Sequence, residues 1–177
     1  MNALSHAWPR RAPARRSFAE VADDHLDGVH QYLLLLTADP TLAEDLAAET
    51  FEKALRAWRR YDPRRASERT WLCRIARSVA LDHFRADARR RRREERFALD
   101  RTWQEDDHIP GAFSAELDAA LRSLTAADRE VIALRVVLDF EADAAAQVLG
   151  IGRAACSMRL ARALRKLEER MEAHAVA

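Results

Sequence analysis

The sequence contains little of what breaks or cross-links a polypeptide: four glycines, five prolines and two cysteines among 177 residues. The shortage of glycine and proline, together with abundant alanine, leucine, arginine and glutamate, favours helix almost throughout and gives little support for a sheet. Cys73 and Cys156 lie far apart and share no CxxC or histidine spacing. This argues against a disulfide framework or a zinc site and predicts the reducing cytoplasm as the location.

Long hydrophobic runs are also missing. No apolar stretch approaches the roughly 20 residues of a membrane-spanning helix, so no membrane insertion is expected. Residues 1–16 carry four arginines and no acid, and they lack the apolar core of a signal peptide. We therefore expect a short, basic and disordered arm at residues 1–16.

A net charge of +1 conceals a strong separation of charge along the chain. Five consecutive arginines stand at 89–93, residues 97–118 hold six acids against one base, and residues 152–166 hold five bases and no acid. This order is typical of two cationic modules joined by an acidic linker. The predicted fold class is all-α, with small helical domains at 17–97 and 115–177 and a flexible acidic linker at 98–114.

The first domain is expected to hold three helices. Apolar residues at three- and four-residue steps predict a helix over about 17–36. A second helix is expected to be capped by Thr41, with Glu44 as its capping-box partner, and to end before a loop over residues 61–70. A third helix is expected from about residue 71 to residue 97.

The second of these helices carries four carboxylates on one side, at Glu44, Asp45, Glu49 and Glu52. On a helical wheel they lie within roughly 140° of one another, opposite an apolar face. A di-metal bundle needs inward-facing carboxylates and a Glu-x-x-His pair, and this segment has no such pair. General-acid catalysis needs a buried or paired carboxylate. The open interpretations are a solvated helix face and a docking face for a basic partner, with catalysis the weakest alternative.

The third helix combines an apolar stripe with arginines on another face, and the arginine run at 89–93 extends this charge. Basic residues at helical spacing suit contacts with phosphate, and neighbouring aromatic residues suit base stacking. A core helix with a solvated basic side explains the stripe well but explains the arginine run poorly. The pattern therefore indicates a polyanionic partner.

The second domain is expected to contain a helix capped by Thr125, and then two helices around a turn at Gly150-Ile151-Gly152. In the last helix Cys156 belongs to an apolar stripe, and basic residues gather on the opposite side. This arrangement is typical of a helix-turn-helix whose recognition helix lies in the major groove of DNA. A helical hairpin with a solvated basic face is the alternative.

Three stretches resemble the bacterial sigma factors of the extracytoplasmic-function (ECF) group, which are subunits of RNA polymerase. They are LLLLTADPTLAEDLAAETFEKALRAWRRYDP, TWLCRIARSVALDHFR and LRSLTAADREVIALRVVLDFEADAAAQVLGIGRAACSMRLARALRKL. The resemblance covers roughly residues 18–95 and 115–170. It implies a factor that is not an enzyme and uses no cofactor or metal. Such a factor binds core RNA polymerase, directs it to specific promoters and helps to melt the −10 element.

The resemblance also implies roles for individual residues. Four carboxylates would dock on the clamp helices of the polymerase: Glu44, Asp45, Glu49 and Glu52. The loop and helix over residues 61–85 would bind the −10 element through Arg64, Arg65, Ser67, Trp71, Arg74, Arg77, Ser78 and Arg85. The last helix would bind the −35 element through Arg153, Ser157, Met158, Arg159, Arg162, Arg165 and Lys166.

Further expectations concern partners and departures from the family pattern. ECF factors are commonly held by an anti-sigma factor, so such a partner is expected, and it could hold the protein at the membrane. The acidic linker would run toward the active-site cleft of the polymerase. Glu68 stands where an aromatic or apolar residue is common, and residues 155–158 replace a usual Thr-Val-Lys-Ser run. An unusual or weakly recognised −35 sequence is the expected consequence.

Two other classes of protein stay open from the residues alone. A conventional helix-turn-helix regulator would bind a palindromic duplex as a dimer, without polymerase. An enzyme built on a carboxylate bundle would hold stoichiometric metal.

Overall fold

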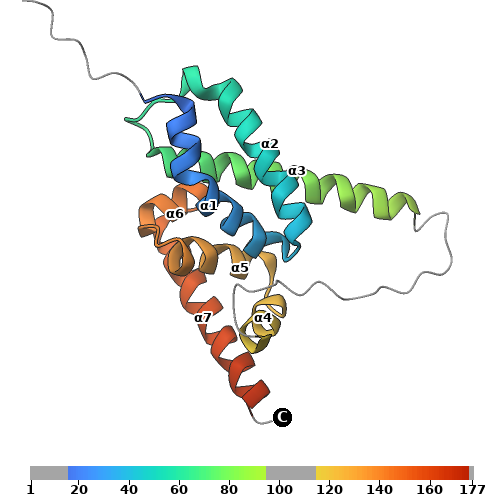
Figure 1. The fold of residues 1–177 in the computed structure, drawn as a ribbon. Helices are drawn as coiled ribbons and strands as arrows, with labels where there is room; N and C mark the ends of the chain where they lie inside the picture. The colour runs from blue at the N-terminus through green and yellow to red at the C-terminus, as the bar shows by residue number, and fades with distance from the viewer. Residues whose placement is uncertain (1–15, 95–114, 176–177) are drawn as a thin grey trace, which may run out of the picture.

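The structure is a computed structural model that describes residues 16–94 and 115–175 (Figure 1). Within these two stretches every regular element is a helix, which confirms the predicted all-α class. The predicted arm, apart from residue 16, and the predicted linker at 98–114 lie outside the described residues. In the described part of the chain no helix is both long and apolar enough to cross a lipid bilayer.

Helix α1 (Phe18–Thr37) begins with a capping box, because its first turn leaves backbone amides without helical partners. The amide of Glu20 donates to the hydroxyl of Ser17 at 3.3 Å, and the amide of Ser17 donates to the Glu20 carboxylate at 2.8 Å. The helix ends at Ala38, whose φ of +57° is in the left-handed region. The predicted first helix is thus confirmed to within a residue.

Helix α2 (Pro40–Ala57) is capped by Asp39, whose carboxylate accepts a hydrogen bond of 2.9 Å from the amide of Leu42. The predicted cap at Thr41 is wrong. Proline suits the first position of a helix, because an N–H at that position would have no helical partner. The helix therefore begins at Pro40, before the predicted cap, and the residue that precedes Pro40 becomes the cap. Asp39 also supplies negative charge near the positive end of the helix dipole.

A single 3₁₀ turn, η1 (Trp58–Arg60), follows α2, and a short loop then leads to α3 (Glu68–Glu94). The predicted start of α3 near Trp71 is three residues too late. The hydroxyl of Ser67 accepts a hydrogen bond of 3.2 Å from the amide of Thr70 and so satisfies one amide of the first turn. The predicted end at residue 97 lies outside the described residues.

The second half of the described chain contains the predicted helix-turn-helix. The predicted cap at Thr125 is confirmed for the helix that precedes this motif, because the Thr125 hydroxyl accepts a hydrogen bond of 3.2 Å from the amide of Asp128. Gly150 has a φ of +67°, a conformation that glycine adopts readily, and it ends the first helix of the pair. The elements are α4 (Ala115–Arg122), α5 (Ala126–Ile132), the π-helical turn η2 (Ala133–Val137), α6 (Ala142–Leu149) and α7 (Arg153–Ala175).

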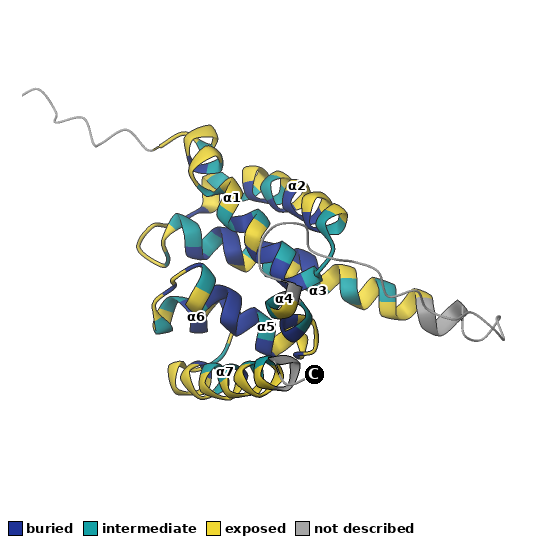
Figure 2. Cartoon of the chain, turned by 60° about the horizontal axis from the view of Figure 1, so that its bottom comes forward, coloured by how far each residue is buried: buried dark blue, intermediate teal, exposed yellow. Residues whose placement is uncertain are grey.

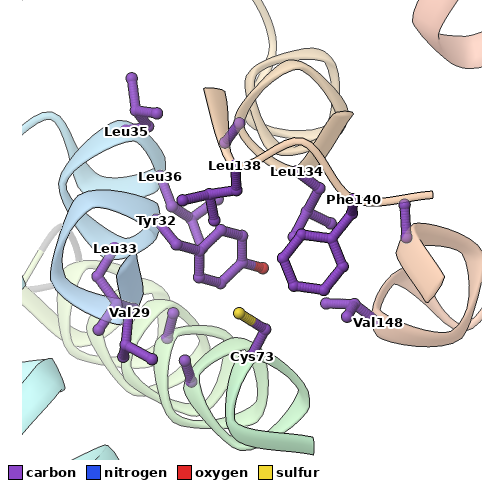
Figure 3. Close-up of a cluster of buried hydrophobic side chains, with 14 of the residues drawn as sticks. Val29, Tyr32, Leu33, Leu35, Leu36, Cys73, Leu134, Leu138, Phe140 and Val148 are labelled. Atoms are coloured by element: carbon purple, nitrogen blue, oxygen red, sulfur yellow. The ribbon is translucent and has the colours of Figure 1, made fainter. Parts of the chain in front are cut away.

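The two halves pack against each other in the structure, with α1 against α5 and α3 against α6 (Figures 1 and 2). Their buried faces point inward and form one continuous apolar core (Figure 2). Figure 3 shows part of this core, built from α1, α3 and the second half of the chain. The residues labelled there are Val29, Tyr32, Leu33, Leu35, Leu36, Cys73, Leu134, Leu138, Phe140 and Val148.

The capping assignment makes a prediction. Asp39→Ala is expected to lower the free energy of unfolding by about 1 kcal/mol, because the amide of Leu42 loses its acceptor. Thr41→Ala, at an exposed position one residue into α2, is the matched control and is expected to change it by less than about 0.5 kcal/mol. Denaturant titration of both full-length variants checks this, and a larger loss in Thr41→Ala than in Asp39→Ala would refute the assignment.

Candidate functional site

The four carboxylates predicted as a strip on α2 are all exposed. Two of them are partly neutralised within the helix, because Glu49 pairs with Lys53 at 2.7 Å and Glu52 pairs with Arg56. Among the described residues no ion pair is recorded for Glu44 or Asp45. The negative charge of the strip is therefore concentrated toward the N-terminal half of α2.

The strip presents four solvent-exposed carboxylates on one face of α2. Catalytic carboxylates generally lie in buried or closely paired surroundings. These four side chains are exposed to solvent, and among the described residues Glu49 and Glu52 pair only with a neighbour on the same helix face. Within the described stretches no group of three or more histidine, cysteine or acidic side chains could hold a metal ion. An exposed apolar residue, Leu55, lies beside the strip with 57% of its surface accessible. Sequence reasoning missed Leu55, although an isolated leucine three residues after Glu52 on a polar face was a usable signal.

A cleft of about 520 Å³ lies between the end of α2, the loop that follows and the first turns of α3. It brings together four of the residues predicted for −10 binding, namely Arg65, Trp71, Arg74 and Ser78. Two further cations, Lys53 and Arg60, line the same cleft and were missed because the sequence places them on a different element.

Three aromatic rings pack together beside this cleft. Tyr61 stacks on Trp58 with ring centroids 5.1 Å apart and an interplanar angle of 8°. Trp71 lies 5.0 Å from Tyr61 and 5.8 Å from Trp58, centroid to centroid. Such contacts add to the burial energy of the rings and fix their orientation. The cleft thus combines cations with an aromatic wall, which suits phosphate and nucleobase groups.

The structure places the other residues predicted for −10 binding differently. Arg64 is exposed on the loop, and Arg85 is exposed on α3, where it pairs with Asp82 at 3.2 Å. Ser67 is the cap of α3 described above. Arg77 turns toward the second half of the chain, where its Nε donates to the Glu130 carboxylate at 2.7 Å.

A second cleft, of about 320 Å³, separates the arginine face of α3 from the helix-turn-helix. One wall carries predicted DNA contacts, and the other wall comes from the end of α6 and the turn after it. The lining includes Arg74, Arg77, Ser78 and Arg85 on one side and Gln147, Val148 and Gly150 on the other. The basic face of α3 is therefore partly covered by the second half of the chain.

Most of the residues predicted for −35 binding share the outer face of α7. Arg153, Ser157, Met158, Arg162 and Arg165 are exposed. Met158 has 61% of its surface accessible. The buried residues Cys156 and Ala163 lie on the opposite side, as the predicted stripe requires.

The other two residues predicted for −35 binding, Arg159 and Lys166, are less available to a partner. Arg159 is half-buried. The Lys166 ammonium donates to the carboxylate of Asp128 at 2.6 Å. Partial burial raises the pKa of Asp128, but hydrogen bonds with Lys166 and Thr125 outweigh it, so that the pKa lies below its ordinary value. Lys166 therefore helps to fasten α7 to α5.

The two cysteines are free and buried. Burial raises the pKa of the Cys73 thiol to about 12, so that this thiol stays protonated and unreactive in the folded chain. Burial also raises the pKa of Cys156. Both are core residues in the structure, in agreement with the interpretation of the sequence.

Comparison with known proteins identifies two family regions in the chain. Residues 21–90 match the model of sigma-70 region 2, and residues 114–167 match the model of sigma-70 region 4. The first match contains α2 with its acidic strip and most of α3, and the second contains the helix-turn-helix.

Individual proteins show the same similarity. The chain is 35% identical over 128 residues to the ECF RNA polymerase sigma factor SigC of Mycobacterium tuberculosis, a match that spans 71% of this chain and 68% of that protein. It is 28% identical over 155 residues to the ECF RNA polymerase sigma factor BldN of Streptomyces coelicolor, spanning 85% of this chain but only 59% of that protein.

A solved structure has a similar fold. It is the sigma factor RpoE of Bartonella quintana in complex with the anti-sigma factor NepR, with a TM-score of 0.73 and 22% sequence identity. The similarity covers 88% of this chain and 96% of the other, so it extends over both halves of the fold.

Proposed function

Because the chain belongs to the ECF group of RNA polymerase sigma factors, we propose that it binds core RNA polymerase, directs it to specific promoters and helps to melt the −10 element. Members of this family are transcription initiation factors, and the proposed activity is recognition and strand opening without catalysis by the chain itself. The observation that carries the proposal is the coexistence of an exposed acidic strip and two basic faces in one small helical chain.

The acidic strip is the proposed docking surface for the clamp helices of the polymerase. Exposed carboxylates pair with basic side chains of a partner and steer the encounter of the two proteins. Glu44 and Asp45 carry most of the uncompensated charge, and the exposed side chain of Leu55 supplies apolar contact beside it. Electrostatic attraction together with an apolar anchor supports a specific interface.

The cleft between α2 and α3 is the proposed site for the −10 element. Its cations, among them Arg60, Arg65 and Arg74, suit the phosphates of a single strand, and its aromatic wall suits an unstacked base. A protein that binds unstacked bases favours strand opening where base pairing is weak. Ser78 lines the cleft, Arg64 and Arg85 lie outside it, and Arg77 becomes available to DNA once its bond with Glu130 is broken.

The outer face of α7 is the proposed reader of the −35 element. A recognition helix places its outward side chains against base edges in the major groove, and arginine pairs with guanine through two hydrogen bonds. Arg162 and Arg165 are exposed there beside Met158, whose apolar side chain suits the methyl group of thymine. Arg153 is the first residue of the same helix, and its exposed side chain pairs with Asp143 of α6 at 3.3 Å.

Simultaneous binding of two DNA elements makes the segment between the domains important. The proposed linker at 98–114 sets which spacings between the −10 and −35 elements both domains can reach at once. An anti-sigma factor is the proposed regulatory partner, supported by the fold shared with a sigma factor solved in complex with one. A cytoplasmic location, at the membrane when such a partner is membrane-bound, follows from this proposal.

The experiment that tests the proposal is a fluorescence titration of the labelled full-length protein with core RNA polymerase. Tight binding at a ratio of one to one is the expected result. An absence of binding, together with tight binding of the free protein to a palindromic duplex, would refute the proposal in favour of a conventional dimeric regulator.

A prediction follows for the −35 reader. Arg162→Ala is expected to weaken binding of the holoenzyme to a promoter it selects by roughly tenfold, and to leave the affinity for core polymerase unchanged. Lys166→Ala is the comparison, and a smaller loss is expected because Asp128 already engages the Lys166 ammonium. Filter binding over a range of salt concentrations measures both effects. Equal promoter affinity in the Arg162 variant and the parent would contradict the assignment.

A further inference from the structure

A carboxylate is buried at the boundary between the two halves of the fold. Glu130 on α5 has only 5% of its surface accessible. One of its oxygens accepts two hydrogen bonds, from the Tyr32 hydroxyl of α1 at 2.8 Å and from the Arg77 guanidinium of α3 at 2.7 Å. These three residues, called the Glu130 triad below, join three helices. They connect the first described stretch, residues 16–94, to the second, residues 115–175, which are called the region-2 half and the region-4 half below.

Other contacts surround the triad at the same boundary. The Arg69 guanidinium lies 4.3 Å from the centre of the Phe140 ring and donates a hydrogen bond to the backbone carbonyl of Leu138. Figure 3 shows the Cys73 sulfur pointing into the space between the rings of Tyr32 and Phe140. The boundary is therefore a packed interface with an apolar centre and specific polar contacts.

The physical character of the triad is that of a selective and reversible contact. A buried ion pair gains little net stability, because the attraction must offset the desolvation of both charges. Loss of one partner is costly, because it leaves a buried charge or hydroxyl without a hydrogen bond. The triad therefore favours one arrangement of the two halves strongly over displaced ones, while separation into water, where all three groups are hydrated, stays accessible.

The arrangement withholds one residue that the proposed function needs. Arg77, whose guanidinium faces Glu130, was predicted to contact −10 DNA. Across the cleft of about 320 Å³, Arg77 faces the end of α6, whereas Arg74 and Arg85 line the same cleft but remain exposed. In contrast, α2 packs on α1 and α3 on the side away from α7, so the acidic strip remains accessible (Figures 1 and 2).

We propose that the Glu130 triad holds the free chain in a closed, DNA-incompetent state, in which the Glu130 carboxylate occupies the position of a DNA phosphate on Arg77. Docking through the exposed strip on α2 comes first, and separation of the two halves then transfers Arg77 from Glu130 to the promoter. The closed state is a property of the chain alone and needs no second protein. The role of the closed state in controlling promoter binding rests on the proposed function. The closed state itself does not depend on that function.

The native cysteines provide the test, and no DNA or polymerase is needed. Cys73 lies at the boundary, and Cys156 is buried within the region-4 half. The full-length protein is exposed to N-ethylmaleimide, and mass spectrometry gives the rate of alkylation at each cysteine. Glu130→Ala is expected to accelerate alkylation of Cys73 by at least about tenfold and to leave the rate at Cys156 unchanged, because only the boundary opens.

A second variant keeps the test valid if Glu130→Ala is poorly folded. Tyr32→Phe retains the buried ring and removes one hydrogen bond to Glu130, so a smaller acceleration at Cys73 alone is expected. Glu168→Ala, an exposed glutamate on α7, is the matched control and should alter neither rate. Unchanged rates at Cys73 in both triad variants would overturn the proposal. Equal acceleration at both cysteines in both variants would also overturn it, because the triad would then stabilise the whole fold.

Binding of a fluorescein-labelled AT-rich single-stranded DNA separates the closure from the proposed function. Glu130→Ala and Arg77→Ala should open the boundary alike, but only Glu130→Ala should bind this strand several-fold more tightly than the parent, because it frees Arg77. If alkylation shows opening and the affinity for DNA is unchanged, the triad is upheld as the cause of closure. In that case the assignment of Arg77 to DNA is overturned.

Discussion

Replacement of Asp45 by lysine is expected to weaken binding to core RNA polymerase by about a hundredfold, because a repulsive charge replaces an attractive one in the proposed docking surface. The fold should be unaffected, since the Asp45 side chain is exposed and no ion pair with another described residue is recorded for it. Titration with labelled protein measures the affinity, and thermal unfolding of the same samples measures stability.

The control for Asp45→Lys is the same charge reversal at another exposed aspartate. Asp23→Lys on α1 changes the net charge equally but lies outside the acidic strip, so its effect on affinity should be small and should disappear at physiological salt. Equal losses in the two variants would show that overall charge, and not the strip, attracts the polymerase. An unchanged affinity in Asp45→Lys would reject the docking assignment outright.

The largest effect on stability is expected from Leu72→Ala. Leu72 lies on α3 with none of its surface accessible, in the core shared by both halves. Truncation of such a leucine removes buried methyl groups and leaves a cavity, which costs about 2–5 kcal/mol. For a chain of this size that loss lowers the midpoint of thermal unfolding by roughly 10 °C.

Leu55→Ala is the matched control for Leu72→Ala. The same atoms are removed from a side chain that is 57% exposed, so the change in unfolding free energy should stay within about 0.5 kcal/mol. Scanning calorimetry of both variants distinguishes the two positions. A loss below about 1 kcal/mol in Leu72→Ala would mean that this part of the core is loosely packed.

The helices could be predicted because their signals are local. The apolar spacing of α1, the cap at Thr125 and the turn at Gly150 each depend on a few neighbouring residues. Even the error at Thr41 was local, since Pro40 decides between two adjacent candidates for the cap and selects Asp39. The π-helical turn after α5 was missed, because the residues that form it fit an α-helix equally well by pattern.

The contacts between the halves could not be predicted, because no pattern in the sequence connects their members. Tyr32 and Glu130 are 98 positions apart, and Glu130 resembles any other glutamate on an amphipathic helix. The candidate −10 site was predicted in part: Arg65 and Arg74 share a cleft, whereas Arg77 is taken up by an ion pair within the chain. Residue type thus indicated a polyanion partner, and only the tertiary structure distinguishes available cations from engaged ones.

The π-helical turn η2 makes the closed arrangement sensitive to the length of the chain at one place. The amide of Leu138 donates to the carbonyl of Ala133, five residues back, at 2.9 Å, so the turn contains one residue more than an α-helix would. Deletion of a single residue there would restore α-helical geometry. It would rotate the following segment by about 100° and shift it by about 1.5 Å. Leu138 and Phe140 would then leave the boundary, so insertions and deletions in this turn, more than substitutions, would decide which related chains can close in this way.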